Sequence, residues 1–221
     1  MTEASIADYQ FSALTEVDGE PAGALLTFEA ASEQSNTYLK KVWEKLSSAL
    51  RSHHDFTASA AECPSWVLWK PLEWSNQNIP ARQKFVAWHA GILAGFVNIQ
   101  ENFPSQFYQR NILYLEHLAA FPGYLNCGIW NRKLHGLGIP LLAFAIFQSL
   151  SRGYSGIVGL HVDGPAMKFY DSLPDTLGFP VFQQVCYDVS GPHPHLDKTK
   201  TQAYLEVMPD AATRILEAIH V

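Results

Sequence analysis

Cysteine, positive charge and long apolar runs are all scarce in this chain of 221 residues. Its three cysteines, Cys63, Cys127 and Cys186, are odd in number and far apart, which argues against a disulfide framework and predicts a reducing, cytoplasmic location. The longest apolar stretch, residues 139–147, is far shorter than the roughly 20 residues that a membrane-spanning helix needs. The N-terminus lacks a basic segment followed by an apolar one, so we do not expect secretion.

Charge and metal ligands exclude two further classes of partner. The formal net charge is −6 and no run of Lys or Arg occurs, so we do not expect a nucleic acid as partner. The short apolar stretches give no reason to expect a membrane as partner either. His193 and His195 lie near Asp197, but a proline separates the histidines and no paired ligand set accompanies them. We therefore expect no metal site.

Apolar side chains are plentiful instead. The chain is 48% hydrophobic and 16% charged, which suits a single domain over residues 1–221. We expect an N-terminal strand and helix part at 1–80, a core at 85–207 and a C-terminal helix at 209–220. Strands are predicted at 9–15, 66–70, 85–90, 92–100, 112–121, 156–162, 181–189 and 203–207. Helices are predicted at 32–51, 139–151, from 163 onward and at 209–219, with loops at 52–64 and 101–110. This order predicts an α/β fold with a mixed sheet.

Two glycines lie between an apolar strand-like run and an apolar helix-like run. Gly136 and Gly138 let the backbone turn tightly and approach a ligand without interference from Cβ atoms. Pro140 falls in the first turn of the helix that follows, where its missing N–H does no harm. A glycine loop that leads into a helix N-terminus favours an anion, which predicts a ligand that carries phosphate. The alternative is that the glycines only make a tight turn.

Four segments resemble the GNAT superfamily of N-acetyltransferases, in the order that this family shows. They are Gly95-Phe-Val-Asn-Ile, Tyr114-Leu-Glu-His-Leu-Ala-Ala-Phe-Pro122, Lys133-x-x-Gly136-x-Gly138 and Ala166-x-x-Phe169-Tyr170. The resemblance covers roughly residues 85–182. It implies an α/β fold with a mixed, mostly antiparallel central sheet, a splayed pair of parallel strands at 112–121 and 156–162, and flanking helices.

The resemblance also implies acetyl-CoA as co-substrate. The backbone amides of residues 134–138 would hold its pyrophosphate, and its pantetheine would pair with the strand edge near Leu118 and Ala120. The residues that the resemblance assigns to this ligand are Leu118, Ala119, Ala120, Lys133, Leu134, His135, Gly136, Leu137, Gly138, Ile139, Asp163, Ala166 and Phe169. Asp163 is in addition the predicted N-cap of its helix.

Glu116 is the candidate base for removing a proton from an attacking amine. Strict alternation puts Ile112, Tyr114, Glu116 and Leu118 on one face of their strand and His117 on the other. A carboxylate among apolar neighbours is harder to ionise, which suits a base. The alternatives are that Glu116 faces solvent, or that it pairs with Arg110 or Arg132. Glu101 and His161 are reserve bases.

Tyr170 is the candidate acid, because it matches the tyrosine of the family's Phe-Tyr pair. A phenol in an apolar pocket can donate a proton to the departing thiolate. The alternative is an ordinary buried aromatic side chain. Pro174 follows closely and is expected to end this helix early.

The resemblance therefore implies transfer of an acetyl or other acyl group to a primary amine of a small molecule or peptide by direct attack. Three departures from the family pattern favour an alternative, a non-catalytic module that binds acyl-CoA. Lys133 stands where the family has Arg or Gln, and Asp163 stands where it often has Asn. The third is the insertion after Tyr170, where Ser172-Leu-Pro-Asp-Thr precedes Gly178-Phe179. The acceptor, the acyl chain length and the oligomeric state stay open, with a homodimer among the states that the sequence allows.

Overall fold

A computed structural model describes residues 10–17, 20–38, 41, 81–120, 134–187 and 202–219, and the structural statements below concern these residues. They form one sheet in the order β6-β1-β2-β3-β4-β5-β7-β9-β8. The strands are β1 (Gln10–Val17), β2 (Glu20–Ala30), β3 (Arg82–His89), β4 (Ile92–Pro104), β5 (Asn111–Ala120), β6 (Leu134–His135), β7 (Val158–Asp163), β8 (Phe182–Tyr187) and β9 (Gln202–Val207). β5 and β7 pair in parallel, and the other neighbours in the described sheet are antiparallel. The mixed, mostly antiparallel sheet with one parallel pair is confirmed.

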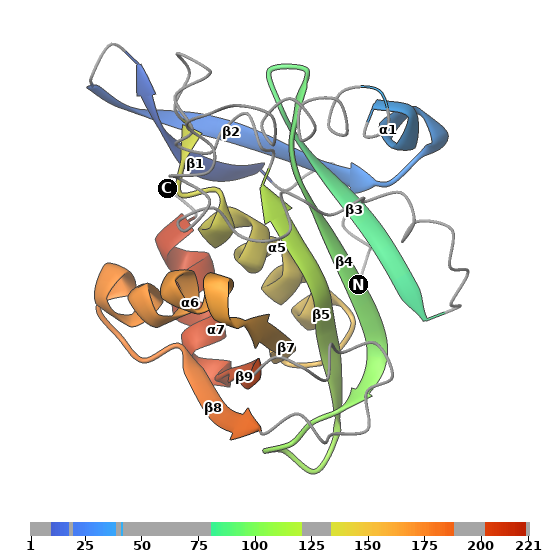
Figure 1. Cartoon of the computed structure of the whole chain (residues 1–221), viewed down its shortest axis with the longest axis vertical. Coiled ribbons are helices and arrows are strands. Elements are labelled where there is room, and N and C mark those ends of the chain that lie inside the picture. The colour runs from blue at the N-terminus through green and yellow to red at the C-terminus, as the bar shows by residue number, and fades with distance from the viewer. Residues whose placement is uncertain are drawn as a thin grey trace.

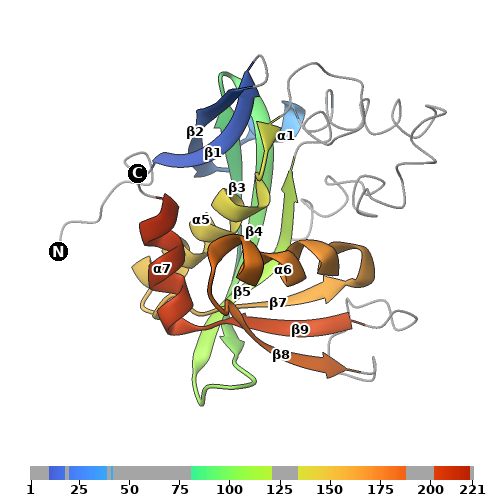
Figure 2. The same ribbon diagram turned by 90° about the vertical axis from the view of Figure 1, so that its left-hand side faces the viewer.

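Helices lie on both faces of this sheet, with more of them on one face than on the other (Figures 1 and 2). They are α1 (Glu33–Tyr38), α5 (Gly138–Ser151), α6 (Gly164–Leu177) and α7 (Pro209–Ile219). Side chains of α5, α6 and α7 share one hydrophobic core with the sheet, and we call this side of the sheet the helical face. Tyr38 of α1 packs on the opposite face, against a smaller cluster that includes Val86 and Phe96.

Helix α5 is largely apolar and lies at the centre of the main core. Phe144 stacks on Phe28 at 4.1 Å between ring centroids and meets Phe11 and Phe85 edge-on. The helix lies close to β4 at Gly95, where a Cβ atom would come within 2.7 Å of the Ala119 carbonyl oxygen and 3.0 Å of the Leu141 side chain. Burial of most of its side chains is what a largely apolar helix requires.

Several element boundaries confirm the sequence predictions. Helix α5 ends at Ser151, and the Gly153 amide closes the last turn on the Leu150 carbonyl at 3.0 Å with Gly153 at φ +82°. The β8–β9 hairpin is antiparallel, α7 begins at Pro209 as expected, and Ala90-Gly91 forms the tight turn between β3 and β4 with positive φ at both positions. These features carry strong local signals, namely a cation and glycine at the stop, and glycine in the turn.

One strand was not predicted, and two predictions about elements are wrong. Residues 20–30 form β2, where no strand was predicted. The expected loop at 101–110 begins with the end of β4, since Phe103 is buried and pairs with Ile112. Pro174 lies inside α6, which continues to Leu177. Of the helix expected at 32–51 the structure describes α1 and residue 41, and the predicted loop at 52–64 and strand at 66–70 lie outside the described residues.

Candidate functional site

The turn before α5 has the expected shape. β6 pairs with β1, Gly136 adopts φ +73°, and α5 begins at Gly138. The Ile139 amide donates to the Gly136 carbonyl at 3.2 Å, whereas within the described part of the chain the amides of Leu137 and Gly138 have no acceptor. Unpaired amides of this kind are a property of helix N-termini and attract anions.

The two glycines have different roles in this turn. A Cβ atom on Gly136 would meet nothing within 4 Å, so Gly136 is open on that side and is needed for its positive φ. A Cβ atom on Gly138 would come within 2.5 Å of the Phe169 ring. Gly138 therefore lets α6 approach the N-terminus of α5, which brings two predicted ligand-binding residues, Gly138 and Phe169, into contact.

The parallel strands separate after a short contact. β5 and β7 pair only at Leu113 with Val158 and at Tyr114 with Gly159, although both strands continue. Beyond these pairs, residues 115–120 of β5 bond to β4 on one side, and no described strand occupies the other side. The predicted splayed pair is thus confirmed, and Leu118, Ala119 and Ala120 lie on the part of β5 that has separated from β7.

A bulge in β5 overturns the expected alternation at Glu116. Asn98 pairs with His117 and Ile99 pairs with Leu115, so Glu116 is an extra residue with no direct partner on β4. Tyr114 faces away from the helices, whereas Leu118 packs in the main core on the helical face. The prediction that Tyr114 and Leu118 share a face is wrong. The prediction that His117 faces away from Glu116 is also wrong, because Asn98 is the cross-strand partner of His117 and hydrogen-bonds Glu116.

Glu116 is buried between two polar partners, neither of which was predicted. Its Oε1 lies 2.5 Å from Arg82 Nε, and both side chains are only 7% exposed. Its Oε2 accepts a hydrogen bond of 2.6 Å from Asn98 Nδ2. Both oxygens of the carboxylate are thus engaged, so Glu116 does not lie in the apolar surroundings expected. The alternatives that Glu116 faces solvent or pairs with Arg110 are not supported by the described contacts. Its side chain is buried, and Arg110 hydrogen-bonds Ser155 instead.

Two basic groups beside Glu116 have lowered pKa values. Burial, and after it the nearby Arg82 charge, together lower the pKa of His117 to about 3. The pKa of Lys84 is also lowered, first by burial and then by Arg82, while Glu116 acts in the opposite sense. We refer to Arg82, Lys84, Asn98, Glu116 and His117 as the polar cluster. It lies on the face opposite α5, and it disfavours further positive charge.

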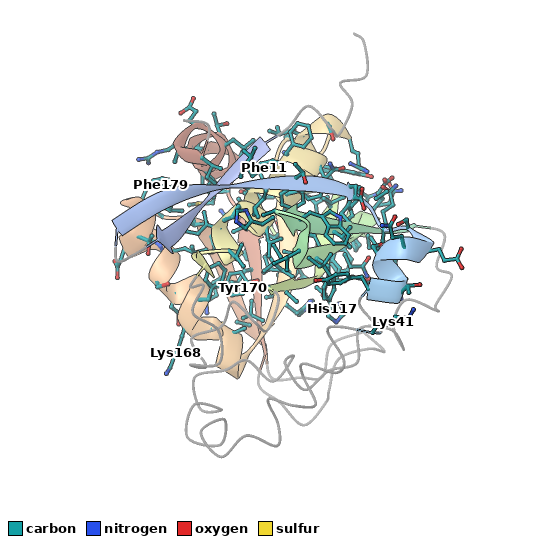
Figure 3. The ribbon with its side chains drawn as sticks, turned by 90° about the horizontal axis from the view of Figure 1, so that it is seen from above. Phe11, Lys41, His117, Lys168, Tyr170 and Phe179 are labelled. Atoms are coloured by element: carbon teal, nitrogen blue, oxygen red, sulfur yellow. The ribbon has the colours of Figure 1, made fainter. Side chains whose placement is uncertain are left out.

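Tyr170 lies on the helical face, in the main core. It is 8% exposed, and its ring packs edge-on against Phe169 at 4.9 Å and Phe182 at 5.8 Å. Burial raises the pKa of the phenol, which therefore stays protonated at neutral pH. It lines a depression together with Pro174 and Leu205, and no described residue hydrogen-bonds its hydroxyl. Figure 3 labels Tyr170, which lies in α6, and His117, which lies in β5, at separate places in the molecule.

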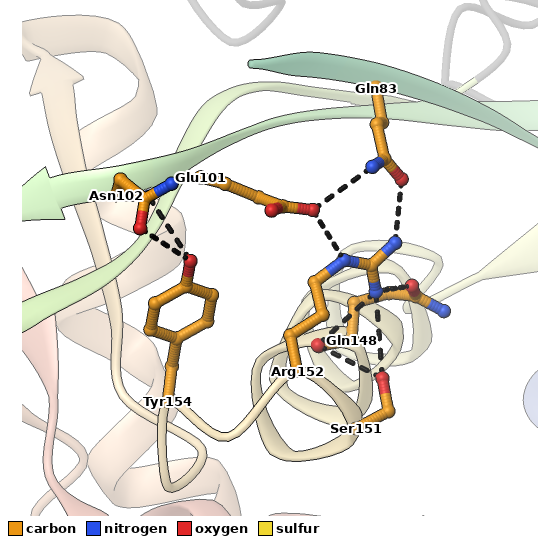
Figure 4. Close-up of polar contacts among 7 residues, drawn as sticks. All are labelled: Gln83, Glu101, Asn102, Gln148, Ser151, Arg152 and Tyr154. Atoms are coloured by element: carbon orange, nitrogen blue, oxygen red, sulfur yellow. Dashed lines mark hydrogen bonds and ion pairs between the residues drawn. The ribbon is translucent and has the colours of Figure 1, made fainter.

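The two reserve bases have structural partners. His161 Nδ1 lies 2.8 Å from the Tyr114 hydroxyl, a contact that joins β7 to β5 where the strands begin to separate. Glu101 Oε1 accepts hydrogen bonds from Arg152 Nε at 2.9 Å and from Gln83 Nε2 at 3.0 Å (Figure 4). This second network ties the end of α5 to β3 and β4, so Glu101 lies in a contact between elements of the fold.

Several predicted residues lie partly or wholly outside the described part of the chain. Lys133 lies outside the described residues, as do Cys127, His193 and His195. For Leu134, His135 and Asp163 the structure describes the backbone, which lies in β6 and β7, and not the side chains. Ala166 and Phe169 lie in the first half of α6 and are half-buried against the main core. In the described ranges, no group of three or more His, Cys, Asp or Glu is placed to hold a metal, and no helix is long and apolar enough to span a membrane.

Sequence reasoning missed Arg82 and Asn98. Arg82 is the first residue of β3 and Asn98 lies in β4, and each reaches Glu116 across the sheet from a position far away in the sequence. The signal that could have found Asn98 is that it is the one amide side chain in the run 93–99, which is buried throughout. Such a residue needs a polar partner.

No model of a protein family and no curated protein sequence matches the chain. Solved structures do. An uncharacterized protein from Bacillus halodurans is 15% identical, with 94% of each chain covered and a TM-score of 0.53. The ribosomal-protein-S18-alanine N-acetyltransferase from Escherichia coli is 16% identical, with 82% of this chain and 92% of that chain covered and a TM-score of 0.46. An aminoglycoside N(6')acetyltransferase from Legionella pneumophila is 12% identical, with 86% and 95% covered and a TM-score of 0.47.

At these identities the likeness concerns the fold alone. The single splayed parallel pair, the long antiparallel sheet and the helices that flank it are the architecture that the resemblance implied. This chain therefore has a GNAT-like fold.

Proposed function

We propose that this protein is a GNAT-type N-acyltransferase that moves an acetyl or other acyl group from acyl-CoA to a primary amine of a small molecule or peptide. The observation that carries the proposal is the early separation of β5 from β7, which pair at only two positions. This separation leaves one side of residues 115–120 available in the described sheet, where the amides of a pantetheine arm can pair with the strand.

The turn before α5 fits the other end of the same ligand. Gly136 is exposed and open, and the amides of Leu137 and Gly138 are without an acceptor among the described residues. We propose that these amides and the dipole of α5 hold the diphosphate of CoA, with Lys133 adding positive charge. We propose that Leu134, His135 and Ile139 contribute backbone to this site, and that Asp163 at the end of β7 and Ala166 and Phe169 of α6 complete it, with Phe169 beside Gly138.

The reaction needs a proton acceptor at the amine and a proton donor at sulfur. The amine nitrogen attacks the thioester carbonyl, a C–N bond forms, and the C–S bond breaks. We propose that the proton leaving nitrogen passes to Glu116, directly or through water, and that the Tyr170 hydroxyl donates a proton to the departing thiolate. Glu116 and Tyr170 lie on opposite faces of the sheet. A thioester placed in the gap between β5 and β7 would thus have one group on each side.

An assay of thiol release from acetyl-CoA with a panel of primary amines tests this function. Turnover with at least one amine, and a loss of turnover in Tyr170→Phe without a change in acetyl-CoA affinity, would support it. Equal turnover in both proteins would remove Tyr170 from the mechanism. Binding of acetyl-CoA without turnover across the panel would instead support the non-catalytic module.

A further inference from the structure

Asn98 presents a buried oxygen whose direction is fixed. The residue lies in the middle of β4 and is completely buried. Its Nδ2 donates to Glu116 Oε2 at 2.6 Å. Because an ionised carboxylate only accepts hydrogen bonds, this contact identifies which end of the amide is nitrogen. The other end, Oδ1, is therefore an acceptor turned away from Glu116, and no residue in the described part of the chain donates to it.

An unpaired buried carbonyl oxygen is costly, and folded proteins rarely keep one without a use. The place of this oxygen suggests its use. Asn98 is the cross-strand neighbour of His117 on β5 and of Lys84 on β3, and it adjoins the bulge that carries Glu116. The same bulge comes one residue after β5 has separated from β7. A donor that meets Asn98 Oδ1 would therefore lie beside the candidate base and near the gap proposed for the thioester.

The polar cluster also indicates the charge of such a donor. Arg82 and Glu116 form an ion pair. Burial and the Arg82 charge lower the pKa values of both Lys84 and His117, which come from different strands, and for Lys84 they outweigh the opposite effect of Glu116. An amine placed among these groups meets the same burial, the same positive charge and the same carboxylate. Its free-base form, which carries the lone pair needed for attack, is thereby favoured over its ammonium form.

We propose that Asn98 is the acceptor-binding residue: its Oδ1 accepts a hydrogen bond from the nitrogen of a primary amine that is bound in its neutral form. The proposal rests on the proposed acyl transfer and specifies its substrate. A primary amine has two N–H groups. One donates to Asn98 Oδ1 and remains in the amide product, and the proton of the other passes to Glu116 after the C–N bond has formed. A secondary amine has one N–H and cannot serve both partners.

Steady-state kinetics with an amine that the enzyme acylates tests this role. Asn98→Leu removes the oxygen, together with the Nδ2 donor to Glu116, while keeping a side chain of similar size. We expect the KM for the amine to rise about tenfold or more while the acetyl-CoA dissociation constant stays unchanged. The matched control is Gln148→Met, which removes another buried amide with an unpaired atom, in α5. An amine KM that is unchanged in folded Asn98→Leu, or that rises equally in Gln148→Met, would overturn the proposal.

A crystallographic experiment gives an answer that does not depend on turnover. Crystals of the full chain are soaked at pH 7 in methoxyamine, which is neutral there, or in methylammonium chloride, which is a cation. We expect methoxyamine nitrogen within hydrogen-bond distance of Asn98 Oδ1 and no methylammonium at this place. A water or a protein donor on Oδ1 in both soaks, or methylammonium alone, would overturn the proposal. This soak contains no acyl-CoA, so its result does not depend on binding of that ligand. A protein that binds no acyl-CoA would refute the proposed function in a separate measurement.

Discussion

At the scale of single residues, the molecule differs most from its sequence pattern at one inserted position. Alternation along a strand predicts faces correctly only while the register is unbroken. The bulge at Glu116 moves Leu118 to the helical face and leaves Glu116 and His117 on the opposite face. Nothing in the residues 112–118 marks this insertion, because a bulge is set by pairing with β4 rather than by a local signal.

His117 gives a prediction about stability and pH. Its pKa is about 3 in the folded protein, against 6.5 as the ordinary value. Between these values the unfolded chain binds a proton that the folded chain does not, so stability present above pH 6.5 is lost as the pH falls. The loss from this group is at most about 1.4 kcal/mol per pH unit. We expect His117→Gln to lose less stability than the wild type between pH 6.5 and 4.5.

Urea unfolding at both pH values measures this effect. The matched control is His89→Gln, which removes a histidine of β3 that bonds the Leu25 carbonyl outside the polar cluster. If His117→Gln and the wild type lose the same stability over this pH range, the buried neutral state of His117 is refuted.

At the scale of elements, local signals predicted the helices and hairpins that have clear stops. The cation and glycine after α5, the turn at Ala90-Gly91 and the start of α7 were all predicted. The prediction failed where packing outweighs a local signal. β2 forms in spite of Pro21 because Leu26 and Phe28 are buried, with Phe28 stacked on Phe144.

Helix α6 is the clearest example of such a conflict. Pro174 has no N–H to donate to the Tyr170 carbonyl one turn earlier, yet the helix continues, and the Pro174 carbonyl accepts the Gly178 amide at 2.8 Å. The buried Leu173 and Phe179 hold this segment in the main core. Tertiary packing therefore stabilises a turn that proline disfavours.

Replacing this proline should consequently stabilise the protein. Pro174→Ala restores one helical hydrogen bond and removes a steric conflict, which outweighs the greater freedom of the unfolded chain. We expect the free energy of unfolding in urea to rise by about 1–2 kcal/mol. Pro180→Ala is the control, since Pro180 lines the same depression but lies outside the helix. A Pro174→Ala variant that is less stable than the wild type would contradict this account of α6.

At the scale of the whole molecule, the sheet links the first described strands to the last. β1 and β6 lie at one edge and β8 at the other, with every described strand hydrogen-bonded to its neighbours. We propose that residues 1–221 fold as one domain, as the composition suggests. Thermal unfolding followed by far-ultraviolet circular dichroism and by tryptophan fluorescence should give coincident transitions. Two separate transitions would show that the chain contains more than one folding unit.

The architecture was predicted better than the chemistry of the site. The resemblance implied the splayed pair, and the structure has it between β5 and β7. The roles of Gly136 and Tyr170 stay predictions. Arg82 and Asn98 could not be predicted, because their contacts with Glu116 depend on the tertiary register of three strands.

The central claim is that the turn from Gly136 into α5 binds the diphosphate of an acyl-CoA, and titration calorimetry with acetyl-CoA tests it most directly. We expect the wild type to bind and Gly136→Glu to bind at least about tenfold more weakly than Gly136→Gln, because both replacements share one backbone conformation and similar size while only Glu repels the diphosphate. No binding of acetyl-CoA or of any longer acyl-CoA by the folded wild type, or equal affinity in the two variants, would contradict the account.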